Sequence, residues 1–483
     1  MSVLGIVLLL AVACLVPLTG LPAFAVLLAM AVLGALAGVA SGSIEPALLA
    51  ALPTRLVNLL ESDLLQALPL YVLVGTLLVR LPIADALFRS TLRLFGHRPW
   101  SPGVATGALG VLLGPMNGSV GASVVALART AAPPLANAGV PASSRQALVA
   151  VAATLGIVVP PSLVLILLGD AMMAAHTIGL RMSGRDDRIL NTQDVFRGAI
   201  VPAALFFIVT VAIACWQLRS NRTVASTTRT QHPLIDAAIA LAAIAFVGGL
   251  LVGVASGRFY AVEGAAAGAF LLVVAAAVTG RLRNGALQEV LRDTIATTGA
   301  LFALLVAATT FTLVFRLLGT DRLLDAWIAT LPGGNTAVTA IVLAAIALSA
   351  LALDAFEIIF VMVPVLMPPL LTRVPDATWV AVLVLLTLQA SFLVPPIGYA
   401  MLMTRGVLRE RVPTRAMVAK VVPFLVAQML VLVTVLAFPQ LVHWTQPADA
   451  TASTTAPMND DDARRQMDQM LSAPPEDPDP PKP

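Results

Sequence analysis

Two stretches of this chain place glycine, proline and short polar side chains inside long apolar runs. The first runs from Gly114 to Ser123 and the second from Thr154 to Ser162. Glycine lets the chain turn within an apolar layer, whereas consecutive prolines remove amide donors and free upstream carbonyl groups. Freed carbonyls are good ligands for sodium, and helix N-termini at such breaks attract carboxylates. The two stretches therefore predict a site that binds a cation and an organic anion together.

The same pattern returns further along the chain. The Pro-Pro steps at 160–161 and 395–396 are separated by 235 residues, and the same offset places Ser119 opposite Asp354. Interrupted apolar segments at corresponding positions in two halves of a sequence are typical of the binding site of a membrane transporter. Glycine and proline also kink ordinary membrane helices, but the repetition at one offset favours a functional site.

Three charged residues lie in or beside apolar runs of the second half. Asp354 and Glu357 separate the apolar runs 341–353 and 358–371, and their spacing places both carboxylates on one face of a helix. Ionisable groups at membrane depth usually face a cavity; the alternative is a loop at the membrane surface. Arg316 is either a partner for a substrate carboxylate or an interfacial residue whose charge reaches the membrane surface.

The candidate ion-binding and substrate-binding residues belong to two turns and two breaks. We expect sodium at the two sites where a turn meets a break, and we expect no other cofactor. The candidates are Asn117, Gly118, Ser119, Gly121, Ser123, Thr154, Gly156, Pro160, Pro161, Ser162, Asp354, Glu357, Gln389, Ser391, Pro395, Pro396 and Gly398, with Arg316 for the substrate carboxylate.

Composition assigns the chain to the lipid bilayer. It is 59% hydrophobic and 11% charged, with a mean hydropathy of +0.93, unlike a soluble domain. Because unpaired peptide groups are too costly in lipid, the spans must be helical. The apolar runs predict spans near 3–17, 20–40, 65–80, 145–173, 197–217, 234–255, 258–280, 295–318, 336–352, 377–404 and 418–444.

Three polar stretches organise these spans. Residues 41–63 are too polar to cross a membrane and predict an amphipathic helix in the interface. Arginines at 219–229 and 281–292 bracket the spans near 234–255 and 258–280, so the positive-inside rule makes both loops cytoplasmic and joins them by a two-helix hairpin. Because the basic residues are spread over loops, they set topology and do not indicate binding to nucleic acid.

The end of the chain has a different composition. From Asp449 to Pro483 there are eight acidic residues, three basic ones and seven prolines, so this tail is expected to be disordered. Basic residues between 405 and 420 make the preceding loop cytoplasmic, and a single span after it would put the tail outside. An extra re-entrant turn near 418–444 would put it inside, and we favour the cytoplasm.

Four segments resemble a known family. They are Gly118-Ser-Val-Gly-Ala-Ser-Val124, Gly156-Ile-Val-Val-Pro-Pro-Ser-Leu163 with Leu168-Gly-Asp170, Leu353-Asp-Ala-Phe-Glu-Ile358 and Leu388-Gln-Ala-Ser-Phe-Leu-Val-Pro-Pro-Ile-Gly-Tyr399. They are similar to the large membrane (permease) subunit of tripartite ATP-independent periplasmic (TRAP) transporters, in the branch labelled mannitol or chloroaromatic transport. The resemblance covers roughly residues 1–445.

The resemblance implies an all-α integral membrane protein with about 11–12 transmembrane helices in two inverted repeats. Each repeat would have a re-entrant hairpin and a broken helix, as in an elevator-type carrier. The hairpins would be the tip Asn117 to Ser123 and the segment Asp354 to Pro369; the broken helices would lie at Thr154 to Ser162 and Gln389 to Gly398. The family's usual plan also places the tail inside.

The resemblance further implies a sodium-coupled importer of an organic acid in the bacterial inner membrane, working with a small membrane subunit and a periplasmic substrate-binding protein. Many relatives have an aspartate in the first hairpin where this chain has Ala122, so the first ion site would depend on carbonyls and hydroxyls.

The expected organisation has five parts. They are 1–98 (N-terminal helices and interfacial arm helix, a scaffold), 99–217 (first transport repeat), 218–292 (connecting helical hairpin and basic loops), 293–445 (second transport repeat) and 446–483 (acidic, proline-rich tail).

Two alternatives remain at this point. A stand-alone ion-coupled organic anion carrier could use the same broken helices without a binding protein. A membrane-embedded enzyme is the more remote alternative, because the four histidines fall near span ends or in loops without a metal-ligand spacing.

Overall fold

The computed structural model describes residues 2–61, 63–96, 98–116, 119–160, 162–219, 233–283, 285–395 and 398–445. Within these ranges the chain forms helices joined by turns, with no strand. Four predicted site residues, Asn117, Gly118, Pro161 and Pro396, lie outside the described residues, as does the tail 446–483. The all-α class predicted from composition is confirmed for the described chain.

The helices follow the apolar pattern of the sequence. A 3₁₀ turn, Gly114–Met116, follows α7, and a π-helical turn, Ile358–Met362, joins α18 to α19. The helices are α1 (Ser2–Thr19), α2 (Ala23–Ala40), α3 (Pro46–Leu49), α4 (Leu52–Leu60), α5 (Asp63–Arg80), α6 (Ile83–Phe95), α7 (Ser101–Leu113), α8 (Val120–Thr130), α9 (Ala132–Asn137), α10 (Ala142–Val158), α11 (Leu163–Ser183), α12 (Thr192–Leu218), α13 (Pro233–Ala255), α14 (Ala261–Val278), α15 (Ala286–Leu317), α16 (Thr320–Thr330), α17 (Asn335–Ser349), α18 (Ala355–Glu357), α19 (Val363–Arg373), α20 (Ala377–Ser391), α21 (Tyr399–Leu408), α22 (Thr414–Ala437) and α23 (Gln440–His443).

Eight of the described helices are long and apolar enough to cross a membrane, or nine if α3–α4 and α5 count as one bent span. A further six apolar helices of 10–17 residues, including both arms of the first hairpin, are too short for this on their own. Because two short helices can share one crossing, the long and short helices together are compatible with the expected 11–12 spans. The chain is a multi-pass membrane protein.

Several boundaries differ from the sequence-based prediction. No helix was predicted at α6 or α16, because each carries several charges among its apolar residues. The second hairpin was expected from Asp354 to Pro369, but its first arm is α17, its turn covers 350–354 and its second arm continues to Arg373. The expected division between residues 292 and 293 falls inside α15.

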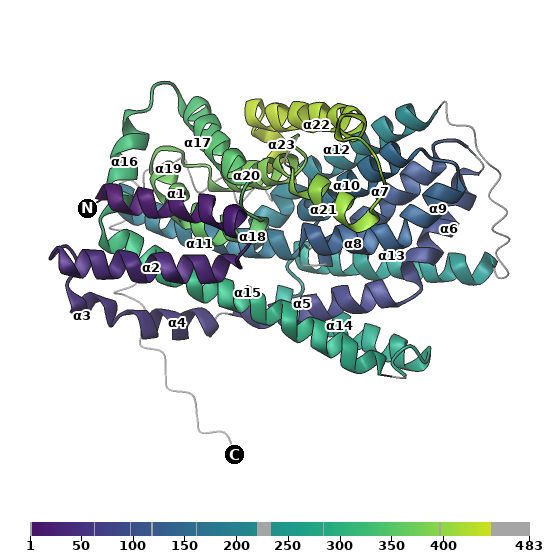
Figure 1. Ribbon diagram of the computed structural model, residues 1–483, viewed down its shortest axis with the longest axis horizontal. Helices are drawn as coiled ribbons and strands as arrows, with labels where there is room; N and C mark the ends of the chain where they lie inside the picture. The colour runs from purple at the N-terminus through teal and green to yellow at the C-terminus, as the bar shows by residue number, and fades with distance from the viewer. Residues whose placement is uncertain are drawn as a thin grey trace, which may run out of the picture.

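The long helix α15 runs along one side of the molecule, as Figure 1 shows. It packs against α2 and α5, and α14 packs against α5. The short helices α3 and α4 lie in the region predicted to be amphipathic, and none of their residues is buried. These helices form a layer along one side of the molecule, beside the two hairpins and the two broken helices.

The two halves contain the same local elements at one offset. Helix α20 begins 235 residues after α10, and each is followed by a break and a further helix, α21 and α11 respectively. The packing repeats as well: α7 packs on α10 as α17 packs on α20, and α8 packs on α21 as α19 packs on α11. In both halves, therefore, the helix after the break packs against the hairpin of the other half.

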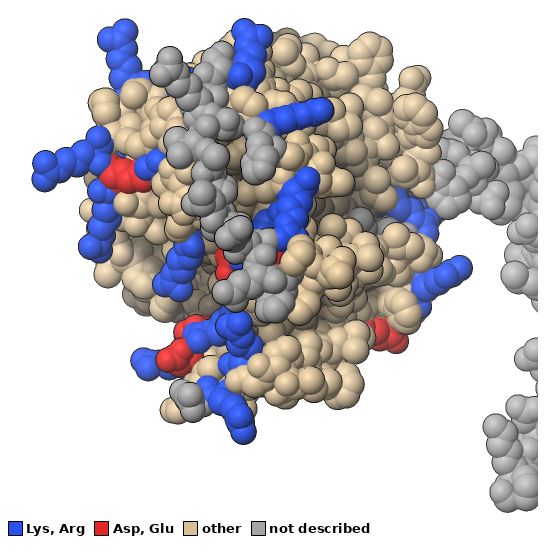
Figure 2. All heavy atoms as spheres, turned by 90° about the vertical axis from the view of Figure 1, so that its right-hand side faces the viewer, with Lys and Arg blue, Asp and Glu red and all other residues tan. Residues whose placement is uncertain are grey.

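Several segments that carry arginine meet at one end of the molecule. Arg80 of α5 binds Glu289 of α15 at 2.6 Å, Arg89 of α6 binds Asp236 of α13 at 2.8 Å, and the Gln217 side chain of α12 donates to the Lys420 carbonyl of α22. Figure 2 shows lysine and arginine spread over this face, with few acidic residues. By the positive-inside rule we expect this face to be cytoplasmic.

The last described residues lie away from this basic face, with α23 near the middle of the molecule in Figure 1. The Thr445 hydroxyl donates to the Arg197 carbonyl, near the start of α12. The other end of α12, at Gln217, contacts the start of α22 on the basic face. Twenty residues of helix separate Arg197 from Gln217, which is about 30 Å and close to the hydrocarbon thickness. Residues 414–437 form one helix, without the extra re-entrant turn that would return the chain to the cytoplasm.

We therefore expect residues 438–445 to be periplasmic. In a background without Cys14 and Cys215, Trp444→Cys should react with a membrane-impermeant maleimide added to intact spheroplasts, because this indole is exposed. Arg411→Cys, in the basic loop before α22, is the matched control and should react only in inside-out vesicles. The reverse labelling pattern would contradict this topology.

Candidate functional site

The first hairpin is seated on the first broken helix through backbone atoms. A Cβ on Gly156 of α10 would lie 2.2 Å from the carbonyl carbon of Gly114, and a Cβ on Gly110 would lie 2.3 Å from the carbonyl oxygen of Ala152. Only residues without a side chain permit this approach. The Ser123 hydroxyl, on the returning arm, points back to the Gly114 carbonyl at 3.5 Å.

Both hairpins turn into their second arm at a capping residue. Ser119 begins α8, and its hydroxyl accepts from the Ala122 amide at 3.1 Å. Asp354 begins α18, and its carboxylate accepts from the Ala355 amide at 2.8 Å, while Glu357 accepts from the Asp354 amide at 3.0 Å. The predicted equivalence of Ser119 and Asp354 is therefore seen in their local structure: each is the N-cap of a hairpin's second arm.

A serine holds the first break together. The Ser162 hydroxyl donates to the Ile157 carbonyl at 2.8 Å and accepts from the Leu165 amide at 3.0 Å, so it connects the end of α10 to the start of α11. Pro160 is buried at this break. Thr154 is fully buried, and its hydroxyl donates to the Val151 carbonyl of its own helix, which leaves the lone pairs of the hydroxyl oxygen for an ion.

The second break is closed by backbone contacts. The Gly398 amide donates to the Val394 carbonyl, and the Ala400 amide donates to the Phe392 carbonyl at 3.2 Å. A Cβ on Gly398 would lie 2.7 Å from that same Phe392 oxygen. Pro395 lies in the turn between α20 and α21.

One buried amide at the end of α20 has no protein partner. Gln389 is fully buried, and neither its side-chain oxygen nor its nitrogen makes a hydrogen bond among the described residues. Its neighbour Ser391 donates to the Thr387 carbonyl of the same helix at 2.6 Å. Because an unpaired buried amide costs about 1–3 kcal/mol, the Gln389 side chain is a candidate for binding water or a ligand beside the break.

Tyr399, which the sequence analysis did not select, joins the two hairpins. A Cβ on Gly121, at the tip of the first hairpin, would lie 2.9 Å from the Tyr399 hydroxyl oxygen. The same hydroxyl is within electrostatic reach of Asp354 and Glu357 in the second hairpin. Its ring packs against Phe392 with 6.1 Å between centroids. The only sequence signal was its position directly after the second break.

The structure thus brings Gly121, Tyr399, Asp354 and Glu357 to one region, between both hairpin tips. Arg316 lies near the end of α15, within electrostatic reach of Arg55 and Asp321. Among the described residues no hydrogen bond or ion pair links Arg316 to the hairpin tips, and its role with a substrate carboxylate stays a prediction. Among the described residues there is no cluster of three or more histidine, cysteine or acidic side chains arranged to hold a metal ion.

Because Gly156 packs directly against the backbone of Gly114, one added methyl group at Gly156 should lower stability. Gly156→Ala should lower the melting temperature of the purified protein and impair transport, because overpacking against backbone atoms costs about 1–3 kcal/mol. Gly299→Ala is the control, since nothing lies within 4 Å of its added Cβ. Equal melting temperatures for the two variants would contradict the close packing.

Comparisons with known proteins agree with this architecture. Residues 6–441 match the family described as "Tripartite ATP-independent periplasmic transporter, DctM component". The C4-dicarboxylate TRAP transporter large permease protein DctM of Rhodobacter capsulatus is 23% identical over 392 residues, covering 79% of this chain and 86% of that protein. The ectoine TRAP transporter large permease protein TeaC of Halomonas elongata is 23% identical over 380 residues, covering 78% and 84%.

The crystal structure of the YdaH transporter of Alcanivorax borkumensis has a similar fold, with a TM-score of 0.60 and 16% identity, over 82% of this chain and 89% of that one. At this identity the similarity concerns the fold alone. Because the family match extends over nearly all the described residues, the chain belongs to the DctM component family of tripartite ATP-independent periplasmic transporters, whose members are large permease subunits and not enzymes.

Proposed function

We propose that this chain imports an organic acid across the bacterial inner membrane in symport with sodium. A periplasmic substrate-binding protein would deliver the acid, and a small membrane subunit would complete the transporter. The sodium ions and the acid would bind where the hairpin tips meet the breaks. The more specific mannitol or chloroaromatic branch also stays a prediction.

The observation that carries this proposal is the position of the Tyr399 hydroxyl, which lies against Gly121 of the first hairpin and within electrostatic reach of the two carboxylates of the second. Asp354 and Glu357 supply carboxylate oxygens on one side of that region, and a carboxylate at membrane depth is compensated when a cation lies beside it. The unpaired amide of Gln389 adds a carbonyl oxygen and two donors at the end of the adjacent helix α20. These groups suit a hard cation and an oxygen-rich organic anion.

The relatives support the substrate class. The two large permease proteins compared above are named for C4-dicarboxylate and for ectoine, and both compounds carry a carboxylate. Their names also assign both to TRAP transporters, which supports a separate binding protein over a stand-alone carrier. Reconstitution with and without that protein distinguishes the two, because a stand-alone carrier would not need it.

Sodium should stabilise the purified protein in the absence of any substrate. A ligand at about 100 times its Kd adds about 2.7 kcal/mol to the stability of the folded state, so replacing potassium chloride by sodium chloride should raise the melting temperature by several degrees. Uptake by the reconstituted transporter should likewise fall when potassium replaces sodium. Uptake driven equally well by a proton gradient without sodium would contradict sodium coupling.

The negative charge of Asp354, and not only its hydrogen bond as the N-cap of α18, should be needed for the stabilisation by sodium. Asp354→Ser keeps an N-cap oxygen and removes the charge, whereas Asp354→Ala removes both and should cost about 1 kcal/mol more stability. We expect both variants to lose the stabilisation by sodium. Asp321→Ser is the matched control, because the Asp321 carboxylate also accepts from the next amide, at 2.9 Å, at the start of α16. If Asp354→Ser kept a normal response to sodium, Asp354 would be a cap alone.

A further inference from the structure

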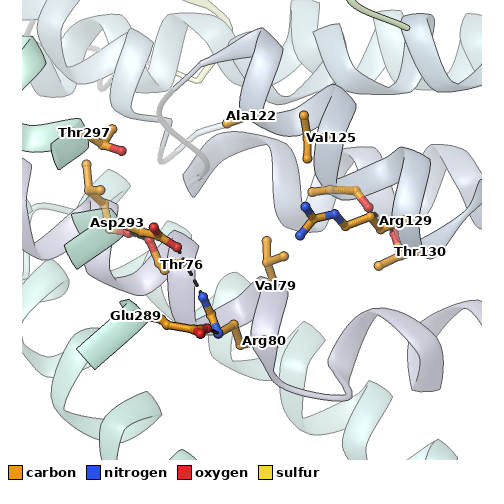
Figure 3. A pocket seen from close by; sticks show the side chains of 12 residues that line it. Thr76, Val79, Arg80, Ala122, Val125, Arg129, Thr130, Glu289, Asp293 and Thr297 are labelled. Atoms are coloured by element: carbon orange, nitrogen blue, oxygen red, sulfur yellow. Dashed lines mark hydrogen bonds and ion pairs between the residues drawn. The ribbon is translucent and has the colours of Figure 1, made fainter. Parts of the chain in front are cut away.

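A cavity of about 540 Å³ lies between the first hairpin and the layer formed by α5 and α15. Figure 3 shows its walls, which come from these three helices. Ala122, three residues after the N-cap Ser119, lines the cavity and is exposed. The cavity therefore reaches the tip of the first hairpin.

The cavity penetrates to a similar depth on all three helices. Its lining runs from Arg80 to Val72 on α5, from Thr130 to Ala122 on α8, and from Glu289 to Thr297 on α15. Each stretch covers nine residues of helix, which is a rise of about 12 Å from end to end. On α5 and α8 the outer end of the stretch carries an arginine, and on α15 it lies beside Arg80. By the positive-inside rule these outer ends are cytoplasmic. The cavity is thus a passage from the cytoplasm to the hairpin tip.

The passage has two walls of different charge. On one wall Arg80 binds Glu289 at 2.6 Å and Asp293 at 3.3 Å, so its charge is already paired. On the facing wall Arg129, at the end of α8, is exposed and makes no hydrogen bond or ion pair with any residue of the described chain. Figure 3 shows its guanidinium on the far side of the space from the acidic pair.

We propose that this passage is the route by which the organic acid leaves the hairpin tips for the cytoplasm, and that Arg129 binds its carboxylate on the way. Arg80, Glu289 and Asp293 together leave one net negative charge on the opposite wall, which repels an anion, so the carboxylate is held on the hairpin side. Arg129 then acts as an exit site, distinct from the breaks. This inference rests on the proposed import of an organic acid, but its electrostatic part is testable without substrate, sodium or partner proteins.

The test uses a thiol within the passage. Val125 lines the cavity one helical turn from Arg129, and it is half-buried. In a background without Cys14 and Cys215, Val125→Cys in inside-out vesicles is treated with a negatively charged and a positively charged methanethiosulfonate. The labelling rate of each reagent is divided by its rate with free cysteine. The ratio of the two corrected rates, negative reagent over positive reagent, is the charge preference of the passage.

Arg129→Gln should reduce the preference for the negative reagent about three- to tenfold, because one positive charge within one helical turn is removed. Arg129→Lys should retain the preference. Arg93→Gln is the matched control: it removes an exposed arginine of α6 that does not line the cavity, and should leave the ratio unchanged.

Two results would overturn the proposal. One is an unchanged ratio in Arg129→Gln. The other is labelling of Val125→Cys from the periplasmic side only, because the passage would then not open to the cytoplasm. A sodium-independent transporter that still showed the Arg129-dependent ratio would refute the proposed coupling and leave the anion site in place, so the two failures are distinguishable.

Discussion

A peptide group in hydrocarbon has no water with which to form hydrogen bonds, so each interruption of a helix must be satisfied by the protein itself. This constraint explains the four interruptions of the described chain. Ser162 bonds to both sides of the first break, and the Phe392 carbonyl receives the Ala400 amide across the second. At the hairpin tips, the side chains of Ser119, Asp354 and Glu357 accept hydrogen bonds from backbone amides at the start of a helix.

The repeated plan makes these interruptions depend on one another. The helix after each break packs on the second arm of the other half's hairpin, α11 on α19 and α21 on α8. Each half therefore supplies the helix that covers the hairpin of the other half. Tyr399 illustrates the result, because it follows the break of the second half yet touches Gly121 in the first hairpin.

The sequence predicted those parts of the structure that depend on local chemistry. The offset of 235 residues between α10 and α20, the breaks and the correspondence of Ser119 with Asp354 follow from the positions of proline, glycine and short polar residues, whereas the capping role of these two residues is seen only in the structure. Tyr399, the unpaired Gln389 amide and the passage beside Arg129 depend on contacts between distant segments, which no local pattern encodes. Helices α6 and α16 were missed because their charges resemble those of loops, although each has one apolar face.

The contact between Gly114 and Gly156 has a mechanical consequence. Side chains can change rotamer to let two surfaces slide, but backbone atoms in direct contact cannot. The outgoing arm of the first hairpin and α10 must consequently move as one rigid body, and the hairpin cannot swing away from α10 as a flap. The surface free to slide is the opposite one, where α8 faces α5 and α15 across open space. If the chain works as the elevator-type carrier that the family resemblance implies, the block that moves would be several helices thick, and its boundary with the static helices would run along the passage.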